Sequence, residues 1–404
     1  MTRDEKEMAS SAASQAVEPG DQQHRKKQQH DHSAVDDNAT FTGYASSGGA
    51  TLHRITFSPR TLGPKDVEID IWYAGICGSD LHILEEDWGE LHGEVVPGHQ
   101  IAGTVAAAGP EALYKVGDRV GASLVIDACM ECEECKAGQE QYCAMKTLMY
   151  KDTFKDGCPA PSYGGFANRI RLCSEFVYKL PNEIHLSHAA PLFCAGLTTF
   201  TALRKYGAGA DKTVGVKGIG ALGHFAIQYA KAMGSKEIVA ITDSDINSED
   251  VTKLGATRCI DFSNKDHLHA ERHKMDLLLV NSFDESTKWE DVLSLVSNHG
   301  TVVILALSKV PIRIPTMQFM HRDIKIVSSF QGGRKDIKEM LEFTAKHDVH
   351  PWIVKVPFDK INDAIELQKK KTARFCIVLE ADESKEKGSN VEANKPVAEQ
   401  YLKD

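Results

Sequence analysis

Apolar runs in the second half of the chain alternate with stretches that have helical spacing. An apolar run over 213–217 is followed by a helical pattern over 224–233 that ends at Gly234, and a second apolar run follows over 237–241. Continuous apolar runs of this length are typical of parallel strands that are buried on both faces. The alternation predicts an α/β fold with a doubly wound parallel sheet. Further strands of the same kind are predicted at 276–281, 301–307 and 324–330.

A glycine motif lies between the first strand and its helix. Gly218, Gly220 and Gly223 have the spacing G-x-G-x-x-G, with Ala221 and Leu222 between the last two glycines. Such a loop brings the backbone close to a pyrophosphate at a helix N-terminus, and its position between strand and helix makes the motif specific. The alternative is a glycine-rich turn without a ligand. The full order of strand, glycines, helix, strand and acid favours a dinucleotide site.

The end of the second strand should select between NAD and NADP. Asp243 lies about twenty residues after the glycine loop, where an acid binds a ribose 2′-hydroxyl. The first basic residue downstream is Lys253, so a 2′-phosphate lacks an obvious cation. Thr242 and Ser244 could still bind a phosphate. The residues favour NAD, and NADP stays open.

Composition limits the class of protein. The 404 residues are 42% hydrophobic and 26% charged, as in ordinary globular proteins, and the net charge of −10 argues against a nucleic-acid partner. We expect no membrane span and, because the first forty residues lack an apolar signal, a cytoplasmic location. Residues 1–40 and 383–404 have too few apolar residues to fold and are predicted to be disordered tails.

Four cysteines, Cys129, Cys132, Cys135 and Cys143, form the spacing C-x2-C-x2-C-x7-C. Four thiolates suit a tetrahedral Zn²⁺ site, with iron as the competitor. The alternative, a disulfide cluster of a secreted protein, is disfavoured by the lack of a signal segment. A site with four protein ligands has no open position, so we expect this zinc to be structural.

Seven motifs follow one another in a fixed order. They occupy 75–82, 97–99, 116–120, 129–143, 163–166, 190–196 and 218–223. With these motifs, residues 41–381 resemble the zinc-dependent medium-chain alcohol dehydrogenases, most closely the cinnamyl-alcohol-dehydrogenase branch. The resemblance implies a GroES-like, β-rich catalytic domain with a structural zinc lobe (41–194 plus 334–382) and a Rossmann domain (195–333).

The resemblance also implies the catalytic residues. Cys77, His99 and Cys194 match the family's ligands of the catalytic zinc, which leave a fourth position for water or a substrate oxygen. Ser79 and His82 match the hydroxyl and histidine that relay the proton. Taken singly, each of these residues is more simply a buried thiol, a loop histidine or a turn cap.

Further matches concern the cofactor and the substrate. The resemblance places Thr198 near the nicotinamide ribose and the loop 328–333 beside the nicotinamide. Leu148 stands where the branch often has a bulky aromatic residue, and Trp88 lies close to the relay in sequence. These two residues are predicted to line the substrate pocket.

Two residues depart from the family pattern. Gln100 follows His99 where the family has glutamate, which removes a negative charge from the surroundings of the zinc. Lys217 precedes the first glycine where an apolar residue is usual, and we expect it either to reach the pyrophosphate or to strain the strand end. The branch mostly uses NADP, whereas Asp243 favours NAD, so both cofactors are retained.

The reaction implied is hydride transfer between NAD(P)H and an aldehyde or primary alcohol, of aromatic cinnamyl type or of medium chain length. Reduction of a C=C or iminium bond is an alternative within the same family. A catalytically impaired scaffold that binds zinc and nucleotide is an alternative outside enzymes. The resemblance implies a homodimer whose partner is a small-molecule substrate.

Overall fold

The computed structural model describes residues 39–91, 93–150, 152–154, 160–243 and 248–382. Apart from residues 39 and 40, the two predicted tails lie outside the described residues, as does Ser244.

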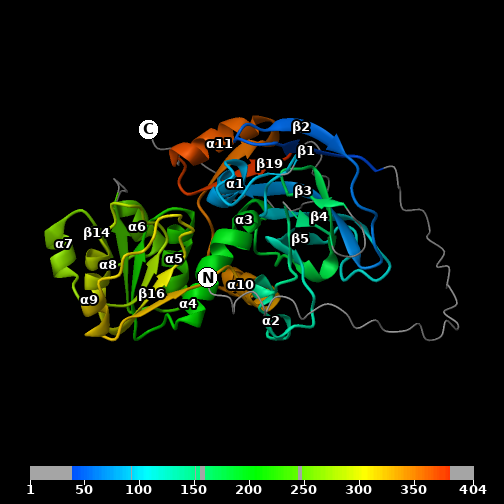
Figure 1. Ribbon diagram of the computed structural model, residues 1–404. Coiled ribbons are helices and arrows are strands. Elements are labelled where there is room, and N and C mark those ends of the chain that lie inside the picture. The colour runs from blue at the N-terminus through cyan, green and yellow to red at the C-terminus, as the bar shows by residue number, and fades with distance from the viewer. Residues whose placement is uncertain (1–38, 92, 151, 155–159, 244–247, 383–404) are drawn as a thin grey trace, which may run out of the picture. The chain divides into compact units, whose positions relative to one another are not determined.

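A six-stranded sheet forms the nucleotide-binding half of the chain (Figure 1). All of its neighbouring strands pair in parallel. In spatial order the strands are β14 (Arg258–Asp261), β13 (Glu237–Thr242), β12 (Thr213–Lys217), β15 (Met275–Val280), β16 (Val296–Ile304) and β17 (Lys325–Ser328). The chain moves outward from β12 in one direction and then from β15 in the other, so the point where the strand order reverses lies between these two strands. Doubly wound sheets bind ligands there, at the carboxyl ends of the strands.

Helices connect these strands. They are α5 (Ala221–Ala232), α6 (Ser248–Leu254), α7 (Lys265–Ala270), α8 (Trp289–Leu295) and α9 (Thr316–Met320). The predicted βαβ order is confirmed, with shifts at the element ends. α5 begins three residues before its predicted start because the glycine loop itself forms the first helical turn. β16 begins at Val296 and ends at Ile304, whereas the prediction was 301–307, because its first residues are polar and lack the apolar signal.

A second, seven-stranded sheet forms the other half. The strands β11 (Val177–Lys179), β5 (Arg119–Ala122), β4 (Ile101–Ala108), β3 (Asp66–Ile76), β19 (Cys376–Glu380) and β18 (Ile353–Pro357) follow one another, and β10 (Arg169–Cys173) also pairs with β3. β19 pairs antiparallel with β3, and α11 (Ile361–Lys370) lies beside it (Figure 1). The predicted return of the C-terminal segment to the first half of the chain is thus confirmed.

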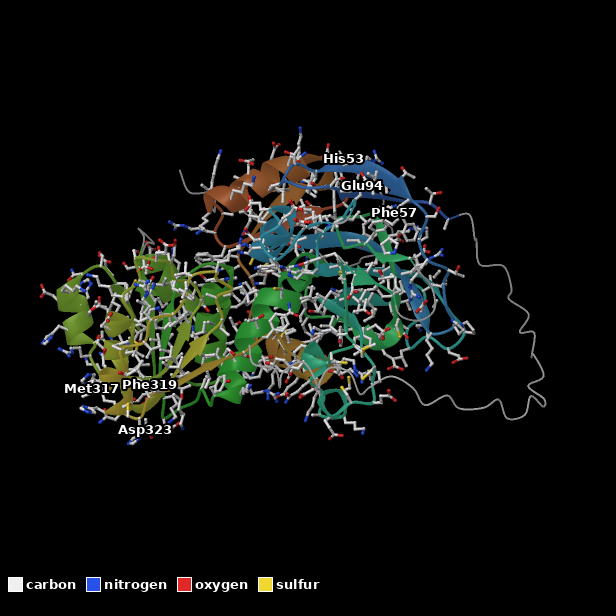
Figure 2. The ribbon with its side chains drawn as sticks, in the orientation of Figure 1. His53, Phe57, Glu94, Met317, Phe319 and Asp323 are labelled. Atoms are coloured by element: carbon white, nitrogen blue, oxygen red, sulfur yellow. The ribbon has the colours of Figure 1, made fainter. Side chains whose placement is uncertain are left out.

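Shorter elements surround this sheet. They are β1 (Phe41–Ala45), β2 (His53–Phe57), α1 (Gly78–Leu84), β6 (Val125–Asp127), α2 (Glu133–Lys136), η2 (Glu140–Tyr142), β7 (Thr147–Leu148), β8 (Asp152–Thr153), β9 (Pro161–Ser162), η3 (Ser174–Phe176) and η5 (Phe358–Lys360). β1 and β2 form an antiparallel pair, and His53 of β2 forms an ion pair with Glu94 at 2.7 Å (Figure 2).

Three consecutive helical segments join the two halves. These are α3 (Leu186–Pro191), the short π-helix η4 (Leu192–Gly196) and α4 (Leu197–Lys205). The helix α10 (Arg334–His347) packs against α4. A single buried core cluster extends from Tyr73 of the seven-stranded sheet through Phe200 of α4 to Val216 of the six-stranded sheet. Because this core is continuous, the domain boundaries given above stay a prediction.

The apolar helical segment that joins the two halves bears on the expectation that the chain has no membrane span. Among the described residues, Leu186–Lys205 is long and apolar enough, by length and composition, to cross a membrane. However, 94% of its window is buried inside the structure. A core helix meets the same length and composition criteria, so this stretch is weak evidence for a span, and its burial explains its apolar character.

Candidate active site and structural metal centre

Three predicted ligands from distant parts of the sequence meet at the junction of the two halves. Cys77 precedes α1, His99 precedes β4 and Cys194 lies in η4, and their ligand atoms all lie within 4.8 Å of one another. The two Sγ atoms are 3.9 Å apart. His99 is 1% exposed, and its Nε2 is buried without a hydrogen-bond partner among the described residues. A buried imidazole nitrogen that faces two thiols fits a Zn²⁺ site with one open position.

Asp80 of α1 orients His99, which the sequence analysis did not anticipate. Its side chain is fully buried, and its Oδ1 lies 2.9 Å from His99 Nδ1. The backbone N–H groups of Cys77 and Gly98 donate to the same carboxylate at 2.8 and 3.1 Å. Because Asp80 engages Nδ1, Nε2 is left to point at the thiols. Burial lowers the pKa of His99, but the charge and hydrogen bond of Asp80 outweigh it and raise the pKa to about 10.

The two thiols behave as a pair. A hydrogen bond from Cys194 lowers the pKa of Cys77, and the same bond together with burial raises the pKa of Cys194. The hydrogen bond between the two sulfur atoms, which are 3.9 Å apart, needs a proton on one of them. A divalent cation would replace that proton, since the metal ligand is the thiolate.

The side chain of Gln100 is 4% exposed and packs against Gly75. A Cβ on Gly75 would lie only 2.5 Å from Gln100 Oε1, so this glycine makes room for the amide. The amide is thus fixed beside the strand that leads into Cys77. The effect of Gln100 on the metal stays a prediction.

The four clustered cysteines also converge. Their Sγ atoms all lie within 4.8 Å of one another, with Cys129 at 3.9 Å from Cys135 and at 3.6 Å from Cys143. Backbone N–H groups, including that of Cys132 at 3.4 Å, lower the pKa of Cys129 to about 6. Four thiols in one closed cluster fit a structural Zn²⁺.

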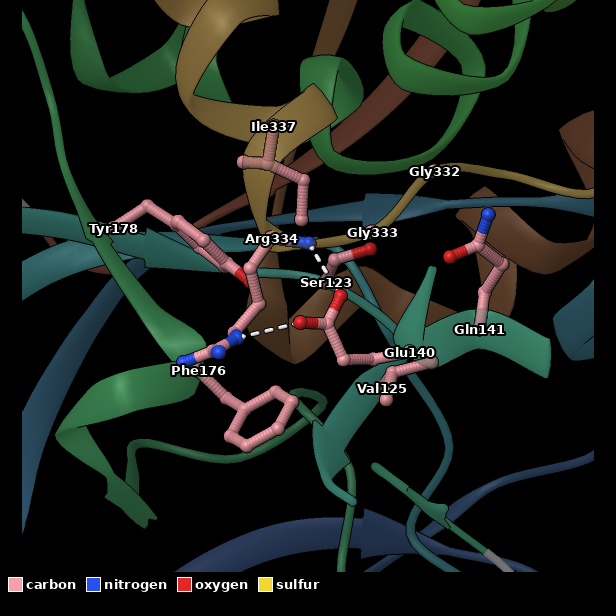
Figure 3. A pocket seen from close by; sticks show the side chains of 10 residues that line it. All are labelled: Ser123, Val125, Glu140, Gln141, Phe176, Tyr178, Gly332, Gly333, Arg334 and Ile337. Carbon is pink, nitrogen blue, oxygen red and sulfur yellow. Dashed lines mark hydrogen bonds and ion pairs between the residues drawn. The ribbon is translucent and has the colours of Figure 1, made fainter. Parts of the chain in front are cut away.

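A buried ion pair attaches this zinc lobe to the loop that precedes α10 (Figure 3). Arg334 Nε donates to Glu140 Oε1 at 2.8 Å, and the Arg334 backbone N–H donates to Oε2 at 3.0 Å. Glu140 is 2% exposed. A Cβ on Gly333 would lie 1.9 Å from the carbonyl oxygen of Gly138, so only glycine allows this approach. The lobe therefore fixes one end of the predicted nicotinamide loop. The two residues that form this link, Arg334 and Glu140, are 194 positions apart in the sequence.

Gln331, in the same loop, reaches the catalytic ligands. Its Nε2 lies 3.9 Å from Cys194 Sγ, and its buried Oε1 has no hydrogen-bond partner among the described residues. The resemblance identified the loop but not this contact. Thr198, one helical turn after Cys194, is 8% exposed, and its predicted role beside the ribose stays a prediction.

The predicted relay residues lie on α1. Ser79 Oγ is 3.7 Å from Cys77 Sγ. His82 Nδ1 lies 2.6 Å from Asp87 Oδ2, and its ring stacks on Trp88 at 4.9 Å. The sequence analysis missed Asp87, whose pKa is lowered by hydrogen bonds from Lys309 and His82. Since Asp87 occupies Nδ1, Nε2 is the nitrogen through which His82 can exchange a proton.

An apolar cluster lies between α1 and the nicotinamide loop. Its buried members are Ile83, Val95, Leu124 and Tyr150, and Leu91, Leu148 and Phe330 pack against them. Leu148 and Phe330 of the nicotinamide loop thus pack against the same cluster, and the place of Leu148 in the substrate pocket stays a prediction. Trp88 is 41% exposed and contacts His82, which puts it beside the relay.

The glycine loop has the close approaches that a dinucleotide site requires. Gly218 has φ +86°, and a Cβ there would lie 2.3 Å from Ser282 Oγ. A Cβ on Gly223 would lie 2.3 Å from the carbonyl oxygen of Gly218. Gly220 precedes α5 and has open space around it, so the loop offers the free N–H groups of the helix N-terminus to a pyrophosphate.

The structure gives Lys217 a partner that neither expectation named. Its Nζ forms an ion pair with Asp243 Oδ2 at 2.6 Å, and its backbone keeps the regular pairing of β12 with both neighbouring strands. Asp243, expected as an unpaired acid for a ribose hydroxyl, therefore already has a cation beside it. Thr242 is 7% exposed at the end of β13. The position of Ser244 lies outside the described residues.

Comparisons with known proteins agree with this geometry. A family model described as "Alcohol dehydrogenase GroES-like domain" matches residues 63–182, and one described as "Zinc-binding dehydrogenase" matches 221–346. The chain is 37% identical over 346 residues to an NADP-dependent alcohol dehydrogenase C of Mycolicibacterium smegmatis, covering 85% of this chain and 98% of the relative.

Solved structures show the same fold. A cinnamyl alcohol dehydrogenase from Sorghum bicolor superposes with a TM-score of 0.81 at 30% identity, covering 85% of this chain and 98% of that one. A cinnamyl alcohol dehydrogenase from Helicobacter pylori, complexed with NADP(H), gives 0.78 at 29% identity, with 84% and 98% covered. The predicted fold, a Rossmann domain with a GroES-like domain, is thus confirmed. The chain belongs to the zinc-dependent medium-chain alcohol dehydrogenases, in their cinnamyl-alcohol-dehydrogenase-like branch, and is an NAD(P)-dependent oxidoreductase of alcohols and aldehydes.

Proposed function

We propose that this enzyme reduces aromatic and medium-chain aldehydes with NADPH. The main support is that Cys77, His99 and Cys194 converge and that His99 Nε2 has no hydrogen-bond partner among the described residues. The same chain has a glycine loop of the kind that binds a dinucleotide. The NADP-dependent and NADP(H)-bound relatives support the choice of cofactor. The alternatives of C=C or iminium reduction and of an inactive scaffold are not favoured.

The residues divide the work between holding, orienting and proton transfer. When bound, Zn²⁺ supplies Lewis acidity at the carbonyl oxygen, and the nicotinamide supplies the hydride. Asp80 holds the tautomer of His99 that leaves Nε2 free for the metal. Ser79 Oγ lies 3.7 Å from the sulfur of the ligand Cys77, so its hydroxyl would be the proton donor beside the metal site. His82, whose Nδ1 is held by Asp87, would hold at Nε2 the proton that restores the Ser79 hydroxyl.

The substrate range follows from the apolar cluster beside the site. Leu148 and Phe330 are side chains without hydrogen-bonding groups, and Trp88 adds an aromatic surface next to His82. Removing apolar substrate surface from water favours longer aldehydes over short ones. We therefore propose cinnamyl-type and medium-chain aldehydes as substrates.

Turnover tests this proposal directly. Oxidation of NADPH and of NADH should be followed with cinnamaldehyde, hexanal and acetaldehyde. We expect kcat/KM to be highest with NADPH and either of the larger aldehydes. A preference for acetaldehyde would contradict the substrate range, and no consumption of either cofactor would contradict the function.

We propose that two copies associate along the edge of the parallel sheet. β17 is its outer strand, and α9 precedes it in the chain. Met317, labelled in Figure 2, is 65% exposed, and Met320 is 69% exposed. An edge strand beside exposed apolar side chains supports pairing with a second copy. Light scattering should give a mass near twice 44.4 kDa. We also propose a cytoplasmic location, which the ten cysteines of the chain support.

A further inference from the structure

Lys217 is a buried cation at an unusual place in the fold. It is the last residue of β12, directly before the glycine loop, and its side chain is 1% exposed. Its Nζ lies 2.6 Å from Asp243 Oδ2 and 4.5 Å from the centre of the Phe262 ring. Phe262 is held at this place because its backbone N–H donates to the carbonyl oxygen of Thr242 at 2.9 Å. The ammonium is thus enclosed by a carboxylate and an aromatic face at the carboxyl ends of two neighbouring strands.

The stability of the fold does not by itself explain why Lys217 and Asp243 form an ion pair here. Replacing a buried ion pair with apolar side chains is often neutral or stabilising, and β12 is otherwise buried among apolar residues. The two members of the pair differ in exposure, because the Asp243 side chain is 51% exposed and the Lys217 side chain is 1% exposed. The carboxylate therefore faces a ligand that approaches from solvent, and the ammonium sets the net charge that this ligand meets.

The ligand at this position is the adenosine ribose. In doubly wound folds the acid at the end of the second strand binds the ribose 2′-hydroxyl, and a bare carboxylate there repels a 2′-phosphate. In this chain the carboxylate has an ammonium at 2.6 Å, so the pair has no net charge. Because Lys217 is 1% exposed, it acts on a 2′-phosphate through the negative charge that it offsets on Asp243 and not by direct contact.

We propose that Lys217 is the counter-ion that determines cofactor selection, by neutralising Asp243 so that the site accepts a 2′-phosphorylated adenosine. This inference rests on the proposed use of NADPH. It adds the residue responsible, which lies in the first strand of the sheet and not in the segment after the second strand. It also explains how a chain with an acid at Asp243 can belong among NADP-dependent relatives.

Binding measurements on the full-length, zinc-loaded protein test the proposal without turnover. Dissociation constants should be measured by calorimetry for NADPH, NADH, 2′,5′-ADP and 5′-AMP. Lys217→Met removes the ammonium but keeps an apolar chain of similar length. We expect it to weaken NADPH and 2′,5′-ADP by about tenfold or more, while NADH and 5′-AMP change by less than about threefold.

A second variant gives the opposite sign. Asp243→Asn leaves the ammonium without its carboxylate, so NADPH and 2′,5′-ADP should bind several-fold more tightly, and NADH should bind more weakly because its 2′-hydroxyl loses an acceptor. Lys217→Met leaves the half-exposed Asp243 in contact with solvent and is expected to fold, whereas Asp243→Asn leaves a buried ammonium with the asparagine oxygen as its acceptor. Circular dichroism should confirm the fold of both variants before titration. In the double variant, Lys217→Met should have a smaller effect on NADPH than in the wild-type protein.

A matched control separates this effect from a general change in charge. Lys265 forms an ion pair with Asp291, also at 2.6 Å, on the surface of the same half of the chain. Lys265→Met should leave all four dissociation constants unchanged. The proposal is overturned if Lys217→Met changes the dissociation constants of NADPH and NADH by the same factor. It is also overturned if Asp243→Asn does not tighten the binding of 2′,5′-ADP. Selective binding without aldehyde turnover would overturn the proposed function and leave this inference standing.

Discussion

Substituting Asp80 with asparagine tests whether this buried carboxylate determines the affinity of the catalytic metal site. The side chain is fully buried and accepts three hydrogen bonds, from His99 Nδ1 and from the N–H groups of Cys77 and Gly98. Asparagine keeps the shape and one acceptor oxygen but loses the charge. Oδ2 accepts from Cys77, whereas Oδ1 accepts from Gly98 and contacts His99, so a single amide oxygen cannot serve both sides. In either orientation of the amide, we expect at least the charge-assisted bond to His99 to be lost.

The magnitude follows from that single bond. A hydrogen bond to a charged group contributes about 1.5–3 kcal/mol, and loss of the group that orients a histidine ligand costs about 10–100-fold in metal affinity. At about 1.4 kcal/mol per factor of ten, these two ranges agree. Zinc should therefore leave the site of Asp80→Asn at a correspondingly lower concentration of a chromogenic chelator.

The four-cysteine cluster serves as an internal reference in this titration, because Asp80 does not contact it. Asp336→Asn is the matched variant, since Asp336 is also buried at the third position of a helix and accepts a backbone N–H, in its case that of Gly333 at 3.0 Å. It should release zinc as the wild-type protein does. Identical release curves for Asp80→Asn and wild type would refute the reasoning, as would a shift confined to the four-cysteine zinc.

Two further predictions concern proton transfer and acid stability. Asp87→Asn should lower kcat about tenfold with little change in KM, because His82 loses the carboxylate that orients it. Lys309→Met is the control, since it removes the other partner of Asp87 and leaves the His82–Asp87 pair intact. An equal fall in kcat in this control would argue against the relay. Burial lowers the pKa of His188 and of His224 to about 4, below the usual 6.5, so the native state holds both rings neutral. Their contribution, on the order of 3 kcal/mol each, is complete above pH 6.5 and is lost as the pH falls towards 4. Urea denaturation at pH 7.5 and pH 5 should show this loss, and glutamine variants of the two histidines should reduce it.

Local sequence patterns were sufficient for the parts of the site that are local in sequence. The four cysteines fall within fifteen residues, so their spacing alone predicts a common metal, and their sulfur atoms converge. The glycine loop is equally local, because strand, turn and helix follow one another without interruption. Cys77, His99 and Cys194 are 117 residues apart at their extremes, and only the resemblance identified them as a group.

The contacts that sequence reasoning missed are those that depend on register between distant segments. Arg334 and Glu140 meet because Gly333, in the nicotinamide loop, passes within contact distance of Gly138 in the zinc lobe. No spacing in the sequence indicates this approach. Asp80 and Asp87 carry no signal of their own in the sequence, and the fold places a histidine beside each of them. An acidic side chain acquires its role from the donor that faces it, and that donor is set by tertiary structure.

Lys217 and Asp243 show how such a contact changes a functional conclusion. Read along the chain, the first was an anomaly in a strand and the second was an argument for NAD. In the sheet, Lys217 pairs with Ile241 in the parallel register of β12 and β13, which brings its side chain to the residue two positions further on. The charge that selects the cofactor is therefore the sum over two adjacent strands, and a cofactor assignment based on the second strand alone omits half of it.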